Sequence, residues 1–241
     1  GSKILMRSAE VYGDTDEPSK FEIWCRDKLH INVMSAISVI ATVLGVALAV
    51  GLFVALPMLL ANLIFSENLR FGNVWYNLTQ GGLRLVIFIL YIVAISAMKD
   101  IRRVFMYHGA EHKCINCVEH GLELNVENVL KSSREHKRCG TSFLIIVMLI
   151  SILFFMVVRV DTIWLRIVSR IVLIPVIAGV SYEVLRLAGT SNSKIMDIVS
   201  RPGMWMQGLT TKEPDDSMIE VAIVAVEAVF DWKKYLEENF P

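Results

Sequence analysis

The segment Tyr107–Cys117, YHGAEHKCINC, gathers two histidines, a glutamate and two cysteines. Imidazole, thiolate and carboxylate groups are the ligands that proteins use for zinc and related divalent transition metals. His108, Glu111 and His112 match H-x-x-E-H, in which two histidines one helical turn apart bind zinc and the glutamate acts as general base. The first hypothesis is therefore a site for zinc or another divalent transition metal, with Glu111 as the catalytic residue.

We expect the segment to lie on a helix from about residue 99 to 120, ended by Gly121. A helix advances by about 100° per residue, so residues spaced by three or four share a face. The residues that we place on one face are His108, Glu111, His112 and Glu119. Cys114 and Cys117 point to the other side, so a single ion cannot take ligands from both sets unless the helix breaks. For this C-x-x-C pair we expect partly buried packing, with zinc or redox chemistry as the alternative.

A second group of candidate ligands, EHKRCGTSF, spans Glu135–Phe143. Its Cys139 and His136 are both competent zinc ligands, and Cys139 could instead act as a nucleophile paired with a histidine. A further ligand is expected from Glu183 in SYEVLR, because an acid at the end of an apolar helix needs a partner. Glu119 is the competitor, in a second shell or at a second ion.

Long apolar runs must position these residues. The 241 residues are 54% hydrophobic, with a formal net charge of zero and a mean hydropathy of +0.53. The lack of a strongly basic balance argues against nucleic acid as a partner. Four runs reach the roughly 20 apolar residues that a bilayer requires. They are Ile31–Phe65, Leu78–Met98, Ser142–Val158 and Ile163–Leu187.

These runs predict an all-α, polytopic membrane protein with about four transmembrane helices; the alternative is a buried soluble bundle. The first run is too long for one perpendicular helix, so we expect it to be tilted, bent near Pro57 or partly immersed. The predicted organisation is a lead-in segment 1–30, a membrane domain 31–188 that includes a loop 99–141, and a tail 189–241. A helix at about 216–238 is expected in the tail.

Lysine and arginine predict the orientation in the membrane. They concentrate in the lead-in segment, the loop 99–141 and the tail, whereas the other two loops carry only Arg70 and Arg159. By the positive-inside rule both termini and the loop 99–141 are cytoplasmic. The candidate ligands would then meet at the cytoplasmic face of the membrane.

Five motifs, YHGAEHK, RCGTSF, SYEVLR, PGMWMQGLTTKEPDD and EVAI, together resemble the bacterial YqhQ-like membrane proteins, a family of unknown function labelled as predicted metal-dependent enzymes. The resemblance extends over nearly the whole chain from about Lys20, and it implies a multi-span protein of the bacterial inner membrane. The positions that match the family pattern are His108, Glu111, His112, Glu119, His136, Arg138, Cys139, Glu183, Arg186, Pro202, Gln207, Thr210, Thr211, Pro214 and Glu220.

The family pattern does not require Cys114 and Cys117, in agreement with the helical-face argument. Family members begin with a Gly-rich GGQA-type segment that this chain lacks. If that segment closes the site, we expect the chain to be inactive or incomplete.

The residues support three hypotheses. The first is a metal-dependent hydrolase with ligands His108, His112 and either Cys139 or Glu183; its substrate would be lipid-linked or a membrane peptide. In it, Glu119, His136, Arg138 and Arg186 are second-shell or alternative ligands. The second hypothesis is a channel or transporter with the cluster as a cation site or gate. The third is a structural zinc that ties the loop 99–141 to the fourth run. Membrane lipids are the expected partners, and a homo-oligomer is left open.

Overall fold

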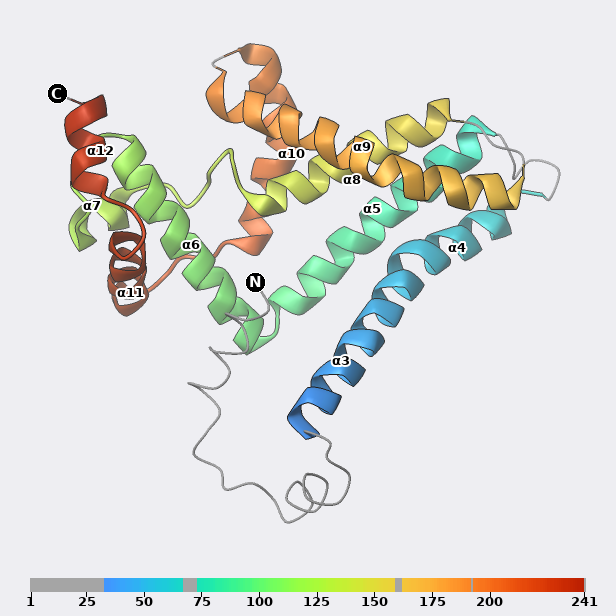
Figure 1. The fold of residues 1–241 in the computed structure, drawn as a ribbon, viewed down its shortest axis with the longest axis horizontal. Helices are drawn as coiled ribbons and strands as arrows, with labels where there is room; N and C mark the ends of the chain where they lie inside the picture. Colours follow the sequence, from blue (N-terminus) through green and yellow to red (C-terminus); the bar gives the residue numbers. More distant parts are fainter. Residues whose placement is uncertain (1–32, 67–72, 159–161, 192, 241) are drawn as a thin grey trace. The chain divides into compact units, whose positions relative to one another are not determined.

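The computed structural model describes residues 33–66, 73–158, 162–191 and 193–240, and every regular element in these ranges is a helix (Figure 1). The chain divides into two compact units, Gly1–Val54 and Ala55–Pro241. The predicted lead-in segment 1–30 lies outside the described residues.

In the first unit, the described residues form helix α3, Val33–Val50, and most of a π-helical turn, η1, Gly51–Ala55. The turn directly precedes helix α4, Leu56–Ile64, where Pro57 is in the first turn. Proline lacks an N–H group, and its ring collides with the carbonyl four residues earlier, here that of Phe53. A π turn widens the backbone locally, which explains why the α-helix is interrupted just before Pro57.

The second unit begins with α4 and contains eight further helices among the described residues. They are α5 (Val74–Ser96), α6 (Lys99–Glu119), α7 (Val126–Lys131), α8 (Gly140–Val157), α9 (Ile163–Thr190), α10 (Lys194–Thr210), α11 (Asp216–Glu227) and α12 (Trp232–Asn239). Helix α8 packs on α5, α9 and α10, and α4 packs on α5. A separate group forms around α6, which contacts α7 and α11.

Four helical segments are long and apolar enough to cross a membrane: Val39–Ile64, Val74–Ser96, Gly140–Val157 and Val168–Thr190. They coincide with the four predicted runs, so the predicted fold class, an all-α protein with four membrane-spanning helices, is confirmed. Many of their large apolar side chains are exposed, as expected for helices that are solvated by lipid rather than by a soluble core.

Helix α6 follows the predicted boundaries closely. It ends at Glu119, and Gly121 adopts a left-handed φ of 75°, which ends a helix with little strain only when the residue is glycine. Cys114 and Cys117 lie on the face of α6 that packs against α7, α11 and α12, and both side chains are fully buried. The prediction that they turn away from the histidines is therefore confirmed, and their packing is complete rather than partial.

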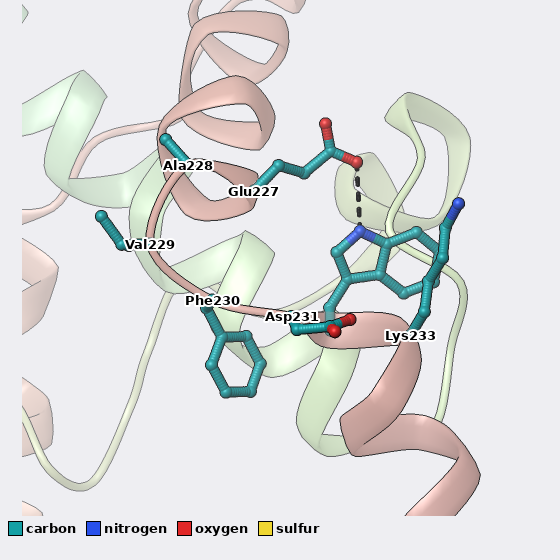
Figure 2. A pocket seen from close by; sticks show the side chains of 7 residues that line it. Glu227, Ala228, Val229, Phe230, Asp231 and Lys233 are labelled. Carbon is teal, nitrogen blue, oxygen red and sulfur yellow. Dashed lines mark hydrogen bonds between the residues drawn. The ribbon is translucent and has the colours of Figure 1, made fainter.

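The tail differs from the predicted single helix at about 216–238, because α11 and α12 are separated by a turn. Asp215 caps α11 by accepting a hydrogen bond from the Met218 amide, and Asp231 caps α12 by accepting one from the Lys234 amide. The turn brings Trp232 into the core around α6, where its indole N–H donates to Glu227 at 3.1 Å (Figure 2). A continuous helix would not permit this packing. Helix α10 was not predicted at all.

Candidate metal centre

Two elements carry the three side chains of the candidate centre. His108 and His112 lie one turn apart on α6, and Cys139 is the N-cap residue of α8. Cys139 has an extended backbone, so its sulfur reaches back over the helix start and accepts from the Thr141 amide at 3.4 Å. Cys139 directly precedes a membrane span, and α6 begins three residues after another. The centre therefore lies at the border of the membrane-spanning region.

The three side chains converge. One ligand atom each from His108, His112 and Cys139 lies within 4.8 Å of the other two. The Cys139 Sγ is 3.3 Å from His108 Nε2, and the centroids of the two imidazole rings are 4.4 Å apart. His112 and Cys139 are buried, whereas His108 is half-buried. The structure thus brings together three of the four predicted ligands.

Backbone carbonyls determine which ring nitrogens are available. His108 Nδ1 lies 3.0 Å from the Thr210 carbonyl oxygen, and His112 Nδ1 lies 2.8 Å from the Arg134 carbonyl oxygen. A carbonyl can only accept, so each Nδ1 carries the proton and donates it. In the neutral imidazoles, Nε2 then holds the lone pair. This is the arrangement by which metal-binding histidines are oriented in proteins.

The electrostatics favour a thiolate beside an imidazolium when no metal is bound. Burial by itself would raise the pKa of Cys139, but hydrogen bonds from His108, His112 and Thr141 outweigh it and lower the pKa of the thiol to about 5. Its hydrogen bond with Cys139 raises the pKa of His108, against the opposing effect of burial. The N-terminus of α8 also favours negative charge on the sulfur.

The loop between α7 and α8 is held to α6 through its own backbone. Lys113 Nζ and Asn116 Nδ2 each donate to two carbonyls of the last turn of α7 or of the loop, and His112 Nδ1 donates to one. The acceptors are the carbonyl oxygens of Leu130, Ser132, Ser133, Arg134 and Glu135. Lys113 is almost completely buried and also pairs with Glu213 at 2.7 Å. These bonds determine where the chain enters α8, and therefore where Cys139 lies.

Helix α10 holds the other side of the same loop. The buried Gln207 accepts from the His136 amide at 2.8 Å and donates to the His136 carbonyl at 2.7 Å. It also donates to Ser142 Oγ in the first turn of α8. Thr210, at the end of α10, supplies the carbonyl that orients His108. Two helices of the loop and tail, α6 and α10, thus clamp the segment that carries Cys139.

Glu119, His136 and Arg138 form a polar group beside the centre. One carboxylate oxygen of Glu119 contacts His136 Nε2 at 3.1 Å, and the other accepts a short hydrogen bond from Arg138. The ring of His136 lies 5.9 Å from that of His112, centroid to centroid. The three residues lie to one side of the candidate ligands, next to His112, without belonging to the converging group.

Three other predicted residues lie outside the converging group. Glu111 is exposed on α6, where its charge contributes to raising the pKa of His108. The side chain of Glu183 is 52% exposed on α9 and pairs with Arg186 at 3.1 Å. The end of α9 contributes in a different way: Gly189 packs directly against the aliphatic part of Arg138, and a Cβ there would overlap it.

Spacing arguments missed Lys113, Asn116, Gln207 and Thr210. The first two sit inside the conspicuous HGAEHKCIN stretch but resemble ordinary polar helix residues. Only the family resemblance pointed to Gln207 and Thr210. Within the spanning helices, the Arg170 guanidinium donates a hydrogen bond to Gln80 at 2.7 Å, and the sequence did not predict this pairing either.

Comparisons with known proteins agree on the family. A model for proteins of unknown function, DUF1385, matches residues 1–232. An uncharacterised protein, YqhQ of Bacillus subtilis strain 168, is 37% identical over 248 residues, covering 99% of this chain and 75% of that protein. No solved structure matches.

Proposed function

The chain belongs to the DUF1385 family of proteins of unknown function, and from this premise and its site we propose that it is a metal-dependent membrane enzyme. His108, His112 and Cys139 hold zinc or another divalent transition metal. A nitrogen, nitrogen and sulfur donor set is one that Zn²⁺ accepts readily.

One observation carries this proposal: both histidines of the converging group are oriented by backbone carbonyls. Thr210 and Arg134 keep the protons on the Nδ1 atoms, so both Nε2 lone pairs are available next to the Cys139 sulfur. A pair of histidines that served packing alone would not need two separate carbonyls and a low-pKa thiol around one point.

The reaction class that fits best is hydrolysis. Catalytic zinc sites use three protein ligands and keep a fourth position for substrate or water, whereas structural sites are closed by four. Among the described residues the converging group has three members. When bound, the metal would polarise the substrate and its attacking water. Glu111, whose charge influences His108, would be the residue to accept a proton from that water.

The position of the centre supports a substrate that is itself in the membrane. Cys139 is the residue immediately before the span Gly140–Val157. A lipid-linked molecule or a membrane peptide could therefore present a polar group at this level without leaving the bilayer. We propose that this is the cytoplasmic side of the bacterial inner membrane, as the distribution of lysine and arginine predicts.

Metal analysis of the purified full chain tests the proposal. We expect about one zinc or similar transition-metal ion per chain. A His108→Ala/His112→Ala double variant should lose it. A Cys114→Ala/Cys117→Ala variant is the matched control, because these two cysteines lie in the core on the opposite face of α6. It should keep its metal. Wild-type protein without metal, purified in the absence of chelators, would refute the proposal.

A second candidate function rests on the same atoms. The Cys139 sulfur, His108 Nε2 at 3.3 Å and the Thr210 carbonyl on Nδ1 reproduce the order of nucleophile, base and orienting group found in cysteine hydrolases. In this case the protein works without metal. An electrophilic acyl probe would then label Cys139 in metal-free protein, and added zinc would inhibit the reaction rather than support it.

A further inference from the structure

Helix α10 divides into three sectors around its axis. The buried sector consists of Ser200, Gly203, Met206, Gln207 and Thr210. A polar sector consists of Lys194, Asp197 and Arg201, and the half-buried Gly208 lies between Asp197 and Arg201 around the axis. The third is apolar yet exposed: Ile195, Ile198 and Trp205 are 67, 61 and 59% exposed. Counted from Ile195 at about 100° per residue, Ile198 and Trp205 fall at about −60° and −80°, so the three form one stripe.

Two sectors are normal for a helix at a protein surface, where the outward face is polar. A third sector that is apolar and exposed indicates contact with something other than water or the chain's own core. The stripe of Ile195, Ile198 and Trp205 contains a tryptophan, a residue type that is enriched in membrane proteins at the level of the lipid head groups.

The position of α10 restricts what this contact can be. Gly203 packs directly on Ser142, in the first turn of the span Gly140–Val157, and Gln207 donates to the same serine. Near its other end, Asp197 pairs at 2.7 Å with Lys137, which precedes that span. Both parts of α10 therefore lie at the same end of α8. Figure 1 shows α10 running across the direction of α8 and α9 rather than along it.

We propose that α10 is an interfacial helix whose stripe of Ile195, Ile198 and Trp205 lies in the lipid of the leaflet on the side of the candidate metal centre. Because α10 packs on the first turn of the span Gly140–Val157, the lipid around that span extends to the stripe. Lys194 and Arg201 are exposed at the edge of the polar sector that adjoins the stripe, where they can reach anionic phosphate groups.

An interfacial α10 connects the membrane to the site whether or not a metal is bound. The same helix that enters the lipid holds His136 through Gln207 and His108 through Thr210. A lipid-seated α10 therefore fixes the level of these residues relative to the membrane surface.

Spin labels at two positions of α10 test the proposal. Ile198→Cys places the label on the stripe, and Gly208→Cys places it in the polar sector, where an added Cβ meets no atom within 4 Å. Both are made in Cys25→Ser/Cys139→Ser protein, which removes the reactive Cys139 thiol and leaves only Cys114 and Cys117, both of which are buried. The protein is placed in nanodiscs of phosphatidylethanolamine and phosphatidylglycerol. Collision rates are measured with oxygen, which partitions into lipid, and with a water-soluble nickel chelate.

We expect the ratio of oxygen to nickel collisions to be several-fold higher at 198 than at 208. Equal ratios at both positions would overturn the proposal. So would spin–spin broadening at 198 that disappears when labelled protein is diluted with unlabelled protein, since a second copy would then cover the stripe.

A milder substitution provides a second measurement. Trp205→Phe keeps a large apolar side chain, so folding should be preserved. Trp75 and Trp164 are also exposed, on α5 and α9, so the emission of Trp205 is taken as the difference between wild-type protein and Trp205→Phe. This difference should be clearly smaller in nanodiscs with brominated acyl chains than in nanodiscs without bromine. A difference that bromination leaves unchanged would show that Trp205 does not contact lipid.

Discussion

A histidine offers a lone pair at Nε2 only when its proton is held on Nδ1, and at His108 and His112 a backbone carbonyl imposes this. The same two rings lower the pKa of the Cys139 thiol to about 5 despite its burial. Cys114 is the contrasting case. Burial, with a smaller contribution from Cys117, raises the pKa of its thiol to about 12. Two cysteines near the same helix thus differ sharply in the pKa of their thiols.

This contrast predicts selective alkylation. In metal-free protein at pH 7, a small reagent such as iodoacetamide should modify Cys139 and leave Cys114 unmodified, because only the thiolate reacts. Peptide mass spectrometry of the labelled protein locates the modified residue. The rate at Cys139 should fall as the pH is lowered through about 5, where the thiolate is protonated.

Added zinc should protect Cys139 from this alkylation if the sulfur binds the metal. Preferential labelling of Cys114 over Cys139 would contradict the pKa assignment. Labelling of Cys139 that zinc does not affect would contradict the proposal that its sulfur binds the metal.

At the scale of elements, the site depends on how closely the segment after α10 crosses α6. The Lys212 amide donates to the Phe105 carbonyl at 2.9 Å, and the Lys212 carbonyl lies directly over Gly109. A side chain at this position of α6 would collide with that backbone. Packing therefore requires a glycine next to His108. The crossing segment directly follows Thr210, so a shift of this segment would also move the carbonyl that orients His108.

Gly109→Ala should consequently destabilise the protein, although alanine is the better helix former. We expect a loss of about 1–3 kcal/mol in the free energy of unfolding, typical of overpacking, together with weaker metal retention. Thermal unfolding in detergent and metal content of the same preparation measure both effects.

Gly208→Ala is the matched control, because its Cβ would meet no atom within 4 Å. It should be neutral or stabilising by up to about 1 kcal/mol. If Gly109→Ala were as well tolerated as Gly208→Ala, the close crossing at α6 would be wrong.

At the scale of the whole molecule, the four membrane spans and the distribution of basic residues predict one topology. Lys131, at the end of α7, belongs to the loop between the second and third spans, and Thr162 lies between the third and fourth. These two exposed positions should therefore lie on opposite sides of the membrane.

A membrane-impermeant maleimide tests this topology in intact spheroplasts. Thr162→Cys should be labelled directly, whereas Lys131→Cys should be labelled only after permeabilisation. Unsubstituted protein gives the background from its own cysteines. The reverse pattern would place the candidate metal centre outside the cytoplasm and contradict the proposed orientation.

Local sequence patterns were sufficient to predict the membrane spans and the face of α6 that carries the two histidines. Hydrophobic runs of bilayer length predicted the four spans, because a membrane imposes that length on any helix that crosses it. Helical periodicity separated His108 and His112 from Cys114 and Cys117, because side-chain direction within one helix follows from spacing alone. The break between α11 and α12 was missed, since the burial of Trp232 against α6 favours it over a continuous helix.

The remaining features required the tertiary structure, because they depend on atoms that sequence patterns do not distinguish. Every residue has a carbonyl, so no motif could show that those of Arg134 and Thr210 orient the two histidines. Likewise, Glu183 was predicted near the ligands because it lies toward the end of the fourth span. In the structure its side chain points to Arg186 on the same helix. Spacing along one helix defines a face, whereas the packing of α6, α8 and α10 determines which groups meet that face.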